Sequence, residues 1–285
     1  MKRRIMGIFL AMALLLAIPS GARGGSGSLV TVHFIDVGQG DCIFIDDGDF
    51  EVLIDAGVAG MGQRASEYIA PFVSGELDLI IATHAHADHV GGLSRVIEDF
   101  DVARIIDSGD EANSKAFREY YGAAMGEKGC EFIPDSDMTV SLPHGEIKIM
   151  EIFDGEENFN NDSVTALLII GGVQVLFTGD SEEKAEELIG GRVGDVDVFK
   201  AGHHGSRTAN TLSFLEEIRP EYVVISCGEG NSYGHPHLEA LQNFADVGAV
   251  SYSTEKSGTV VMTTDGSSYW FNTDAALDED DAGGR

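Results

Sequence analysis

The chain has 285 residues, of which 43% are hydrophobic, and this is enough apolar material for a folded core. Its formal net charge of −30 at pH 7 opposes binding to a long polyanion unless metal ions or local basic residues compensate. The three cysteines are widely spaced and form no C-x-x-C pair, which argues against a cysteine metal site or a disulfide framework.

The N-terminal segment has the pattern of a secretory signal peptide. Residues 1–22 begin with three basic residues, continue with an apolar run over 5–18 and end with small residues at Ser20 and Ala22. The run is shorter than the roughly 20 residues of a membrane span, although an uncleaved N-terminal anchor is an alternative. We expect cleavage after Ala22, a linker over 23–28 and a mature protein that is secreted, cell-surface or periplasmic.

The rest of the chain alternates strands and helices, as in a layered α/β protein. The first half predicts three strands between 29 and 55, a helix over 63–73, a buried strand near 77–82, a helix over 91–100, a strand from about 103, and a helix over 111–126. A hairpin over 138–153 and two strands over 164–180 follow. The last third predicts a helix over 181–189, a strand over 195–204, a helix over 210–217, a strand over 221–228, a helix after Pro236 and three final strands up to about 272. We therefore expect one domain over 29–273 and an acidic, disordered tail over 274–285.

Histidine and aspartate side chains are concentrated in "THAHADHVGG", residues 83–92. The segment follows a buried strand, so it lies on a loop at the strand's carboxyl end. His84 and His86 can chelate one divalent ion there, and Asp88 with His89 can chelate a second. Four such donors within six residues predict a binuclear metal site.

Two later strand ends offer the remaining donors. Asp180 ends the strand "LFTGD" and is placed to bridge two ions. The segment "FKAGHHGS" contributes His203 and His204. We prefer His203 as the ligand because it follows the strand directly through Gly202, while His204 would contact the ligands or the substrate; the opposite assignment is the alternative.

The order of "LIDAG", "THAHADH", "TGD" and "GHH" resembles the metallo-β-lactamase superfamily over residues 29–272. Four further motifs, "HFIDVGQGDCIFI", "NNDS", "AGHHGS" and "GNSYGHPH", are similar to the extracellular metallohydrolase domain of ComEC-type competence proteins. This resemblance implies a four-layer αββα sandwich whose site lies at one edge, between the two sheets. A ComEC-type membrane channel is not expected, because no later apolar stretch is long enough to span a membrane.

The resemblance also implies a role for each ligand. It assigns His84 and His86 to the first ion, Asp88, His89 and His203 to the second, and Asp180 to both. Asp55 of "LIDAG" matches an acid that supports the metal loop. His86 stands where ComEC-type members often have aspartate, and this favours zinc over manganese.

Other side chains are expected to line the site. Asn161 and Ser163 of "NNDS" stand where most of the superfamily has a third histidine for the first ion. His235 and His237 of "YGHPH" either contact the substrate or cap the helix that follows. The expected catalytic residues are Asp88, Asn161, Ser163, His204 and His235.

Two divalent ions about 3.5–4 Å apart lower the pKa of a bound water and neutralise charge on the attacked group. The expected function is therefore hydrolysis of a phosphodiester, in a small molecule or a nucleic acid. The alternatives are hydrolysis of another bond, such as a lactam, a lactone or a cell-wall phosphoryl ester, and a metal-binding protein without activity.

The first testable prediction concerns the signal peptide over residues 1–22. Protein recovered from outside the cytoplasm should begin near Arg23, and N-terminal sequencing or intact mass would establish this. A soluble species that still begins at Met1 would contradict cleavage.

Overall fold

The computed structural model describes residues 29–153 and 158–274. The predicted leader and linker, and the tail beyond Asp274, lie outside these residues. The described chain forms two sheets. The first has the strand order β15 (Tyr269–Thr273), β14 (Val260–Thr264), β1 (Val30–Phe34), β2 (Ile43–Asp46), β3 (Glu51–Ile54), β4 (Leu77–Ala82), β5 (Val102–Asp107) and β6 (Glu131–Pro134). The second has the order β13 (Val250–Ser253), β12 (Tyr222–Ile225), β11 (Val198–Lys200), β10 (Val173–Phe177), β9 (Thr165–Ile170), β8 (Gly145–Met150) and β7 (Met138–Ser141).

The main core lies between the two sheets. Val32 and Ile45 of the first sheet and Leu168 and Val175 of the second belong to one buried cluster. Valine and isoleucine dominate it because their branched side chains pack well on a pleated surface. Each such side chain contributes roughly 1.5–3 kcal/mol when it is fully buried.

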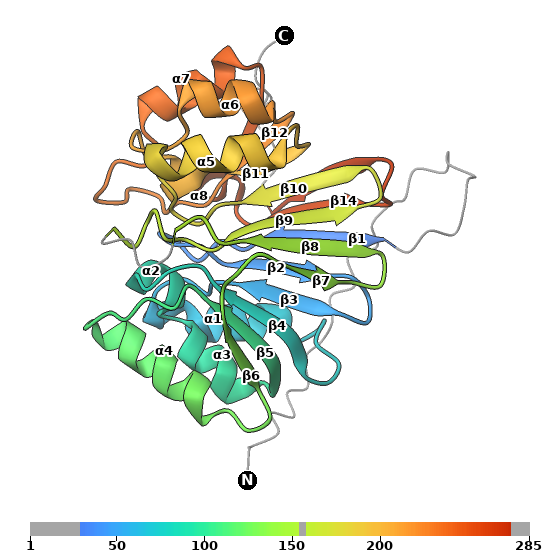
Figure 1. The fold of residues 1–285 in the computed structure, drawn as a ribbon, viewed down its shortest axis with the longest axis vertical. Coiled ribbons are helices and arrows are strands. Elements are labelled where there is room, and N and C mark those ends of the chain that lie inside the picture. The colour runs from blue at the N-terminus through green and yellow to red at the C-terminus, as the bar shows by residue number, and fades with distance from the viewer. Residues whose placement is uncertain (1–28, 154–157, 275–285) are drawn as a thin grey trace.

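Helices cover the outer face of each sheet (Figure 1). The first sheet carries α1 (Gly62–Ile69), α3 (Leu93–Asp99) and α4 (Lys115–Gly126), and the second carries α5 (Glu183–Val193), α6 (Leu212–Ile218) and α7 (Leu238–Asp246). The short elements are η1 (Ala59–Met61), α2 (Ala87–Val90), η2 (Gly202–Gly205) and α8 (Thr254–Ser257). The predicted four-layer αββα sandwich is confirmed. No helix in the two described ranges is long and apolar enough to cross a membrane.

Each sheet contains a block of parallel strands, β3 to β6 in the first and β10 to β13 in the second. Side chains at the carboxyl ends of parallel strands meet at one edge of a sheet, where ligands bind in α/β folds. The pairing of Ile54 with Ile81 brings the loops after β3 and β4 together, and the pairing of Phe177 with Lys200 does the same for β10 and β11. Both edges lie on the side of the molecule where Figure 1 places α2.

The elements differ from the predictions at a few boundaries. Helix α1 ends at Ile69 instead of 73 because Pro71 has no backbone N–H to continue the hydrogen bonds of the helix. Helix α4 begins at Lys115 because the Ser114 side chain accepts a hydrogen bond from Phe117 N. Strand β6 and the short helix α8 were not predicted; β6 is an edge strand whose side chains are half-buried or exposed, so it has no apolar alternation.

Candidate metal centre

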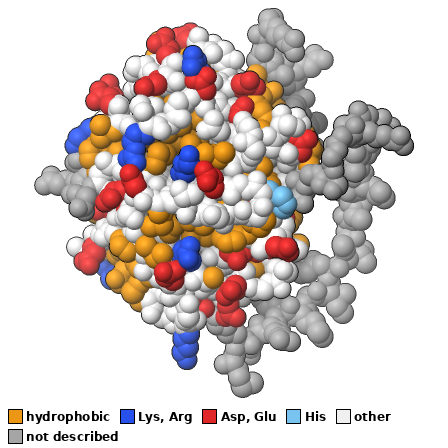
Figure 2. Space-filling view, turned by 45° about the vertical axis from the view of Figure 1, so that its right-hand side comes forward, with side chains coloured by type: hydrophobic (Ala, Val, Ile, Leu, Met, Phe, Trp, Pro, Cys, Tyr) orange, Lys and Arg blue, Asp and Glu red, His pale blue; other side chains and the backbone are white. Residues whose placement is uncertain are grey.

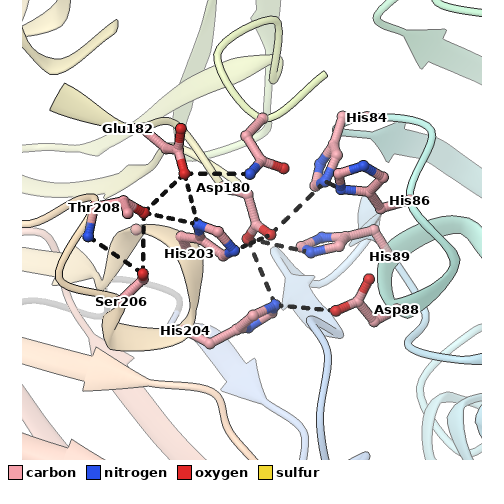
Figure 3. Close-up of polar contacts among 12 residues, drawn as sticks. His84, His86, Asp88, His89, Asp180, Glu182, His203, His204, Ser206 and Thr208 are labelled. Atoms are coloured by element: carbon pink, nitrogen blue, oxygen red, sulfur yellow. Dashed lines mark hydrogen bonds and ion pairs between the residues drawn. The ribbon is translucent and has the colours of Figure 1, made fainter. Parts of the chain in front are cut away.

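The predicted metal-binding residues come from three loops that meet at this edge. His84 and His86 follow β4, Asp88 and His89 lie on α2, Asp180 follows β10, and His203 and His204 lie on η2 after β11. Their polar groups face one another in Figure 3. Four of these side chains are almost completely buried, namely His84, His89, Asp180 and His204.

The α2 loop packs closely against the loop after β3. A Cβ atom on Gly92 would lie 2.1 Å from the Ala56 carbonyl oxygen, so only glycine permits this approach. Across the same contact, the backbone N–H group of Ala56 donates to the His89 carbonyl oxygen, and that of Gly92 donates to the Gly57 carbonyl oxygen. The glycine pair after the histidine motif therefore fixes the position of Asp88 and His89.

Asp180 lies at the middle of the group. Its Oδ1 is 3.2 Å from His89 Nε2 and 3.6 Å from His204 Nε2. Its Oδ2 is 3.8 Å from His84 Nε2 and 3.7 Å from His203 Nε2. The two oxygens of one carboxylate therefore face two different pairs of imidazoles.

The remaining donors form a group on either side of Asp180. On one side, His84 Nε2 and His86 Nδ1 are 3.0 Å apart. On the other, Asp88 Oδ2 is 3.5 Å from His204 Nε2, and donor atoms of Asp88, His89 and His204 all lie within 4.8 Å of one another. We refer to His84, His86 and Asp180 as the first donor group, and to Asp88, His89, His204 and Asp180 as the second donor group.

Hydrogen bonds to the outer nitrogens orient two of these imidazoles. His204 Nδ1 donates to the Ser226 carbonyl oxygen at 3.0 Å, and His89 Nδ1 lies 2.8 Å from Asp55 Oδ2. Asp55 in turn accepts from Thr83 N at 2.9 Å and from its hydroxyl at 2.6 Å. Because carbonyl and carboxylate oxygens accept, Nδ1 carries a proton in both rings, and Nε2, which faces Asp180, is the nitrogen that offers a lone pair to a cation when the ring is neutral.

The residues fit a metal ion. His89 Nε2, His204 Nε2 and Asp180 Oδ1 are buried and have no hydrogen-bond partner in the described structure. Buried polar atoms without a partner are costly in free energy and rare in folded proteins. Neutral imidazole nitrogens and carboxylate oxygens are the usual ligands of zinc and related divalent ions. A cation between these atoms would satisfy all three.

Protons compete with metal for the second donor group. Burial alone would lower the pKa values of His89 and His204, but the Asp180 carboxylate and their other carboxylate neighbours more than reverse this. The pKa of His89 is raised well above its usual value, and that of His204 is raised to about 9. A protonated imidazole has no lone pair for a cation, so metal binding must release protons.

The metal affinity should therefore keep increasing with pH between roughly pH 7 and roughly pH 9, whereas a site of ordinary histidines would level off near pH 7. Competition with a chelator of known pH dependence measures this. An affinity that is constant above about pH 7 would contradict the raised pKa of His204.

The two histidines after β11 differ in their contacts. Both have positive φ, 47° for His203 and 55° for His204, and in this left-handed turn their Nε2 atoms face different oxygens of Asp180. His203 is 23% exposed, and its Nδ1 lies 3.2 Å from Glu182 Oε1 and 3.3 Å from Thr208 Oγ1. The sequence favours His203 as the ligand, but of the two histidines it is His204 whose nitrogen lies within 4.8 Å of donor atoms from both Asp88 and His89. The geometry therefore favours His204.

Asn161 and Ser163 support the other side chains. The Ser163 hydroxyl accepts from Asp180 N at 3.2 Å and lies 3.3 Å from His84 Nδ1. Asn161 Oδ1 accepts from Glu182 N at 3.1 Å. The segment that lacks the third histidine thus holds the loop of Asp180 in place.

His235 lies beside the histidine pair. Its ring centroid is 5.5 Å from that of His203 and 6.1 Å from that of His204. Burial lowers the pKa of His235 to about 4, so the ring is neutral near pH 7. His237 precedes α7 without a side-chain capping bond to the helix and instead accepts from Arg207 N. The capping role considered for the two histidines is therefore absent from His237.

Two charged residues at the site were not singled out from the sequence. Glu182 accepts hydrogen bonds from Thr208 and Asn158, and the hydrogen bond with His203 is the main cause that lowers its pKa to about 2. Lys200 is 1% exposed and contacts Asp41. A signal for Lys200 was present, because a lysine that ends the apolar strand "DVDVFK" is unusual in a buried position.

An αββα sandwich with a buried histidine–aspartate centre at its sheet edge defines a class of metal-dependent hydrolases. Residues 35–229 match the family model of the metallo-β-lactamase superfamily, and the chain belongs to this superfamily. It is therefore a metal-dependent hydrolase, and its fold implies divalent metal ions.

The relatives include competence proteins, as the motifs indicated. The chain is 27% identical over 235 residues to Recombination protein 2 of Haemophilus influenzae, and the aligned region covers 80% of this chain and 28% of the relative. It is 28% identical over 256 residues to ComE operon protein 3 of Bacillus subtilis, and this aligned region covers 80% of the chain and 32% of the relative. The chain thus spans about a third of the length of these relatives or less. Among solved structures, the metallo-β-lactamase fold protein YhfI of Bacillus subtilis aligns with a TM-score of 0.53 at 11% identity, over 79% of this chain and 95% of that one.

Replacement of the central carboxylate should remove metal. Asp180→Ala deletes the oxygens that face both donor groups, so metal analysis of the purified variant should show much less bound metal than the wild type, together with loss of hydrolase activity. Asp49→Ala, in an exposed turn, is the control and should retain both. Full metal content in Asp180→Ala would contradict a bridging position.

Proposed function

We propose that the protein is an exported phosphodiesterase or nuclease that uses two divalent ions, with zinc preferred over manganese. The position of Asp180 is the observation that carries this proposal, because its two oxygens face two separate groups of imidazoles. When bound, two such ions supply an activated water and neutralise the charge that develops on the attacked phosphoryl group. Metal analysis of the wild-type protein should then give about two equivalents.

The donor groups suggest how the residues divide the two ions. The first donor group would hold one ion, and the second donor group would hold the other, with Asp180 common to both. This assignment replaces His203 by His204 as the ligand that completes the second ion. The first ion would have fewer protein donors, because Ser163 stands where a third histidine is expected and bonds to His84 and Asp180 instead.

His203 is then free to contact the substrate. It is the partly exposed imidazole of the pair, and Glu182 and Thr208 hold its Nδ1 so that Nε2 faces Asp180. His235 packs against it. We assign both histidines to substrate contact, while Asn161 and Ser163 position the loop of Asp180 and Glu182.

The phosphodiester is favoured by the resemblance to ComEC-type metallohydrolase domains and by the chemistry of a two-ion centre. A pair of ions can stabilise both the attacking and the leaving oxygen of an in-line displacement. The net charge of −30 favours small diesters over long nucleic acids, and it also favours the second candidate, hydrolysis of an uncharged lactam or lactone. On the face in Figure 2, however, acidic side chains are interspersed with basic and apolar ones and form no continuous acidic surface.

Two variants of adjacent residues separate ligand binding from substrate contact. His204→Ala should lose about one equivalent of metal and several orders of magnitude in turnover, because a missing ligand removes the ion that stabilises the transition state. His203→Ala should keep the wild-type metal content and still lose activity. Metal loss in His203→Ala, with none in His204→Ala, would restore the assignment made from the sequence.

The bond that is cleaved can be tested on the metal-loaded protein with DNA, RNA, bis-p-nitrophenyl phosphate, a chromogenic cephalosporin and a lactone. We expect cleavage of bis-p-nitrophenyl phosphate with little dependence on salt. If DNA is cleaved, moderate salt should increase the rate, because it screens repulsion between two negatively charged partners. Cleavage of the lactam or the lactone without any phosphodiester, at every salt concentration, would support the second candidate.

A further inference from the structure

A buried ion pair joins the two sheets behind the metal centre. Lys200 Nζ lies 2.8 Å from Asp41 Oδ2, and both side chains are 1–2% exposed. Lys200 is the last residue of β11 in the second sheet, and Asp41 lies in the loop between β1 and β2 of the first sheet. Nζ also donates to the Ala201 carbonyl oxygen at 2.9 Å, so the ammonium is fixed at the start of the loop that carries the histidine pair.

The other oxygen of Asp41 faces His204. Asp41 Oδ1 is 3.2 Å from His204 Nδ1, the nitrogen that also donates to the Ser226 carbonyl oxygen at 3.0 Å. The carbonyl is the better aligned acceptor, and Asp41 Oδ1 has no other hydrogen-bond partner in the described structure. The N–H group of His204 thus lies between two acceptors, and its ring cannot turn without losing both contacts.

The backbone of Asp41 contacts the opposite half of the second donor group. Asp41 N donates to the Asp88 carbonyl oxygen at 3.2 Å, and Gly57 N donates to the Asp41 carbonyl oxygen at 2.8 Å. Gly40 permits this contact, because a Cβ atom there would lie 2.3 Å from the Asp88 carbonyl oxygen. One residue therefore contacts Asp88 of the first sheet through its backbone and His204 of the second sheet through its side chain.

Lys200 supplies the charge that makes this arrangement stable. Asp41 is buried close to other carboxylates of the centre, where an unpaired negative charge would be strongly unfavourable. The ammonium pairs with Oδ2 and leaves Oδ1 directed at His204. The first donor group has different supports, since the hydroxyls of Thr83 and Ser163 contact His84.

We propose that Asp41 and Lys200 are a positioning pair that holds the two halves of the second donor group in register and thereby sets the affinity for the second metal ion alone. This inference rests on the proposed role of His204 as a ligand. In this proposal neither residue is a ligand or contacts the substrate: Asp41 Oδ1 faces His204 Nδ1, whereas the nitrogen of that ring that faces Asp180 is Nε2. Their effect is transmitted through the orientation of His204 and the position of the Asp88 loop.

The chain offers a matched control at the other end of β2. Asp47 is also buried, and it joins the sheets by accepting from the backbone N–H of His144 and by pairing with its ring, in the turn between β7 and β8. Asp47→Asn and Asp41→Asn therefore remove comparable buried charges from opposite ends of one strand. Only Asp41 lies at the metal centre.

The experiment titrates zinc or cobalt(II) into metal-free Asp41→Asn, Lys200→Met, Lys200→Arg and Asp47→Asn proteins against a chelator. Asp41→Asn and Lys200→Met should bind the first equivalent as the wild type does and the second about 10- to 100-fold more weakly, the usual effect of losing a partner of a ligating histidine. Lys200→Arg should restore most of this affinity, because it retains the charge. Asp47→Asn should lower the melting temperature and change neither affinity.

A second readout follows the orientation of the imidazole without metal. Nitrogen-15 NMR of the histidine side chains, recorded above about pH 9 where the His204 ring is neutral, should show a single Nδ1–H tautomer for His204 in the wild type and a mixture in Asp41→Asn. A fixed tautomer in Asp41→Asn with wild-type affinity for both ions, or equal loss of both ions, would show that the pair is merely structural. If Lys200→Met does not fold, the isosteric Asp41→Asn decides.

The variant His204→Ala separates the positioning pair from the proposed ligand set. If His204→Ala still binds the second ion, the proposed ligand set is wrong. If His204→Ala loses the second ion and Asp41→Asn keeps it, only the positioning pair is wrong.

Discussion

The burial of the Asp180 carboxylate is the constraint on which the rest of the site depends. Burial by itself raises the pKa of this group, yet the surrounding imidazoles lower it well below its usual value, so the carboxylate stays ionised. A buried anion is tolerated only where positive charge compensates for it. The imidazoles can supply that charge as imidazolium groups or, with a lone pair, through a metal cation that they share with the carboxylate. The buried carboxylate therefore requires a cation in either state. Metal binding should accordingly stabilise the folded loops that form this edge of the sheets.

The fold delivers these groups from segments that are far apart in the sequence. Parallel strands end at the same edge, so the loops after β3 and β4 bring Asp55 and His84 together, and the loops after β10 and β11 bring Asp180 and His204 together. The apolar core between the two sheets then holds the site-bearing edge of one sheet next to that of the other. The αββα sandwich thus determines which residues can meet, while contacts of the rings with the hydroxyls of Thr83 and Ser163 and with the Ser226 carbonyl oxygen determine how the rings are turned.

The sequence predicted the layered fold and the members of the cluster, because strand periodicity and a dense histidine motif are both local signals. It could not determine whether His203 or His204 is the ligand. That choice depends on a left-handed turn at two non-glycine residues, and their residue types do not predict this conformation. Nor could it pair Lys200 with Asp41, because the contact arises only when the two sheets pack. Strand β6 was missed for a simpler reason, namely that an edge strand with no buried face has no periodic pattern.

The charge of the centre also bears on the kind of substrate. Four aspartates contact the candidate ligands or belong to them, Asp41, Asp55, Asp88 and Asp180, and the buried cation paired with them is Lys200. With neutral imidazoles, these groups leave a net negative charge that would repel a phosphodiester. Glu182 beside His203 adds a further negative charge, so one divalent ion would leave the centre negative, whereas two would neutralise it and remove the repulsion of an anion. A two-ion centre is thus the state in which this acidic protein can approach an anionic ester, while an uncharged lactone would need no such compensation.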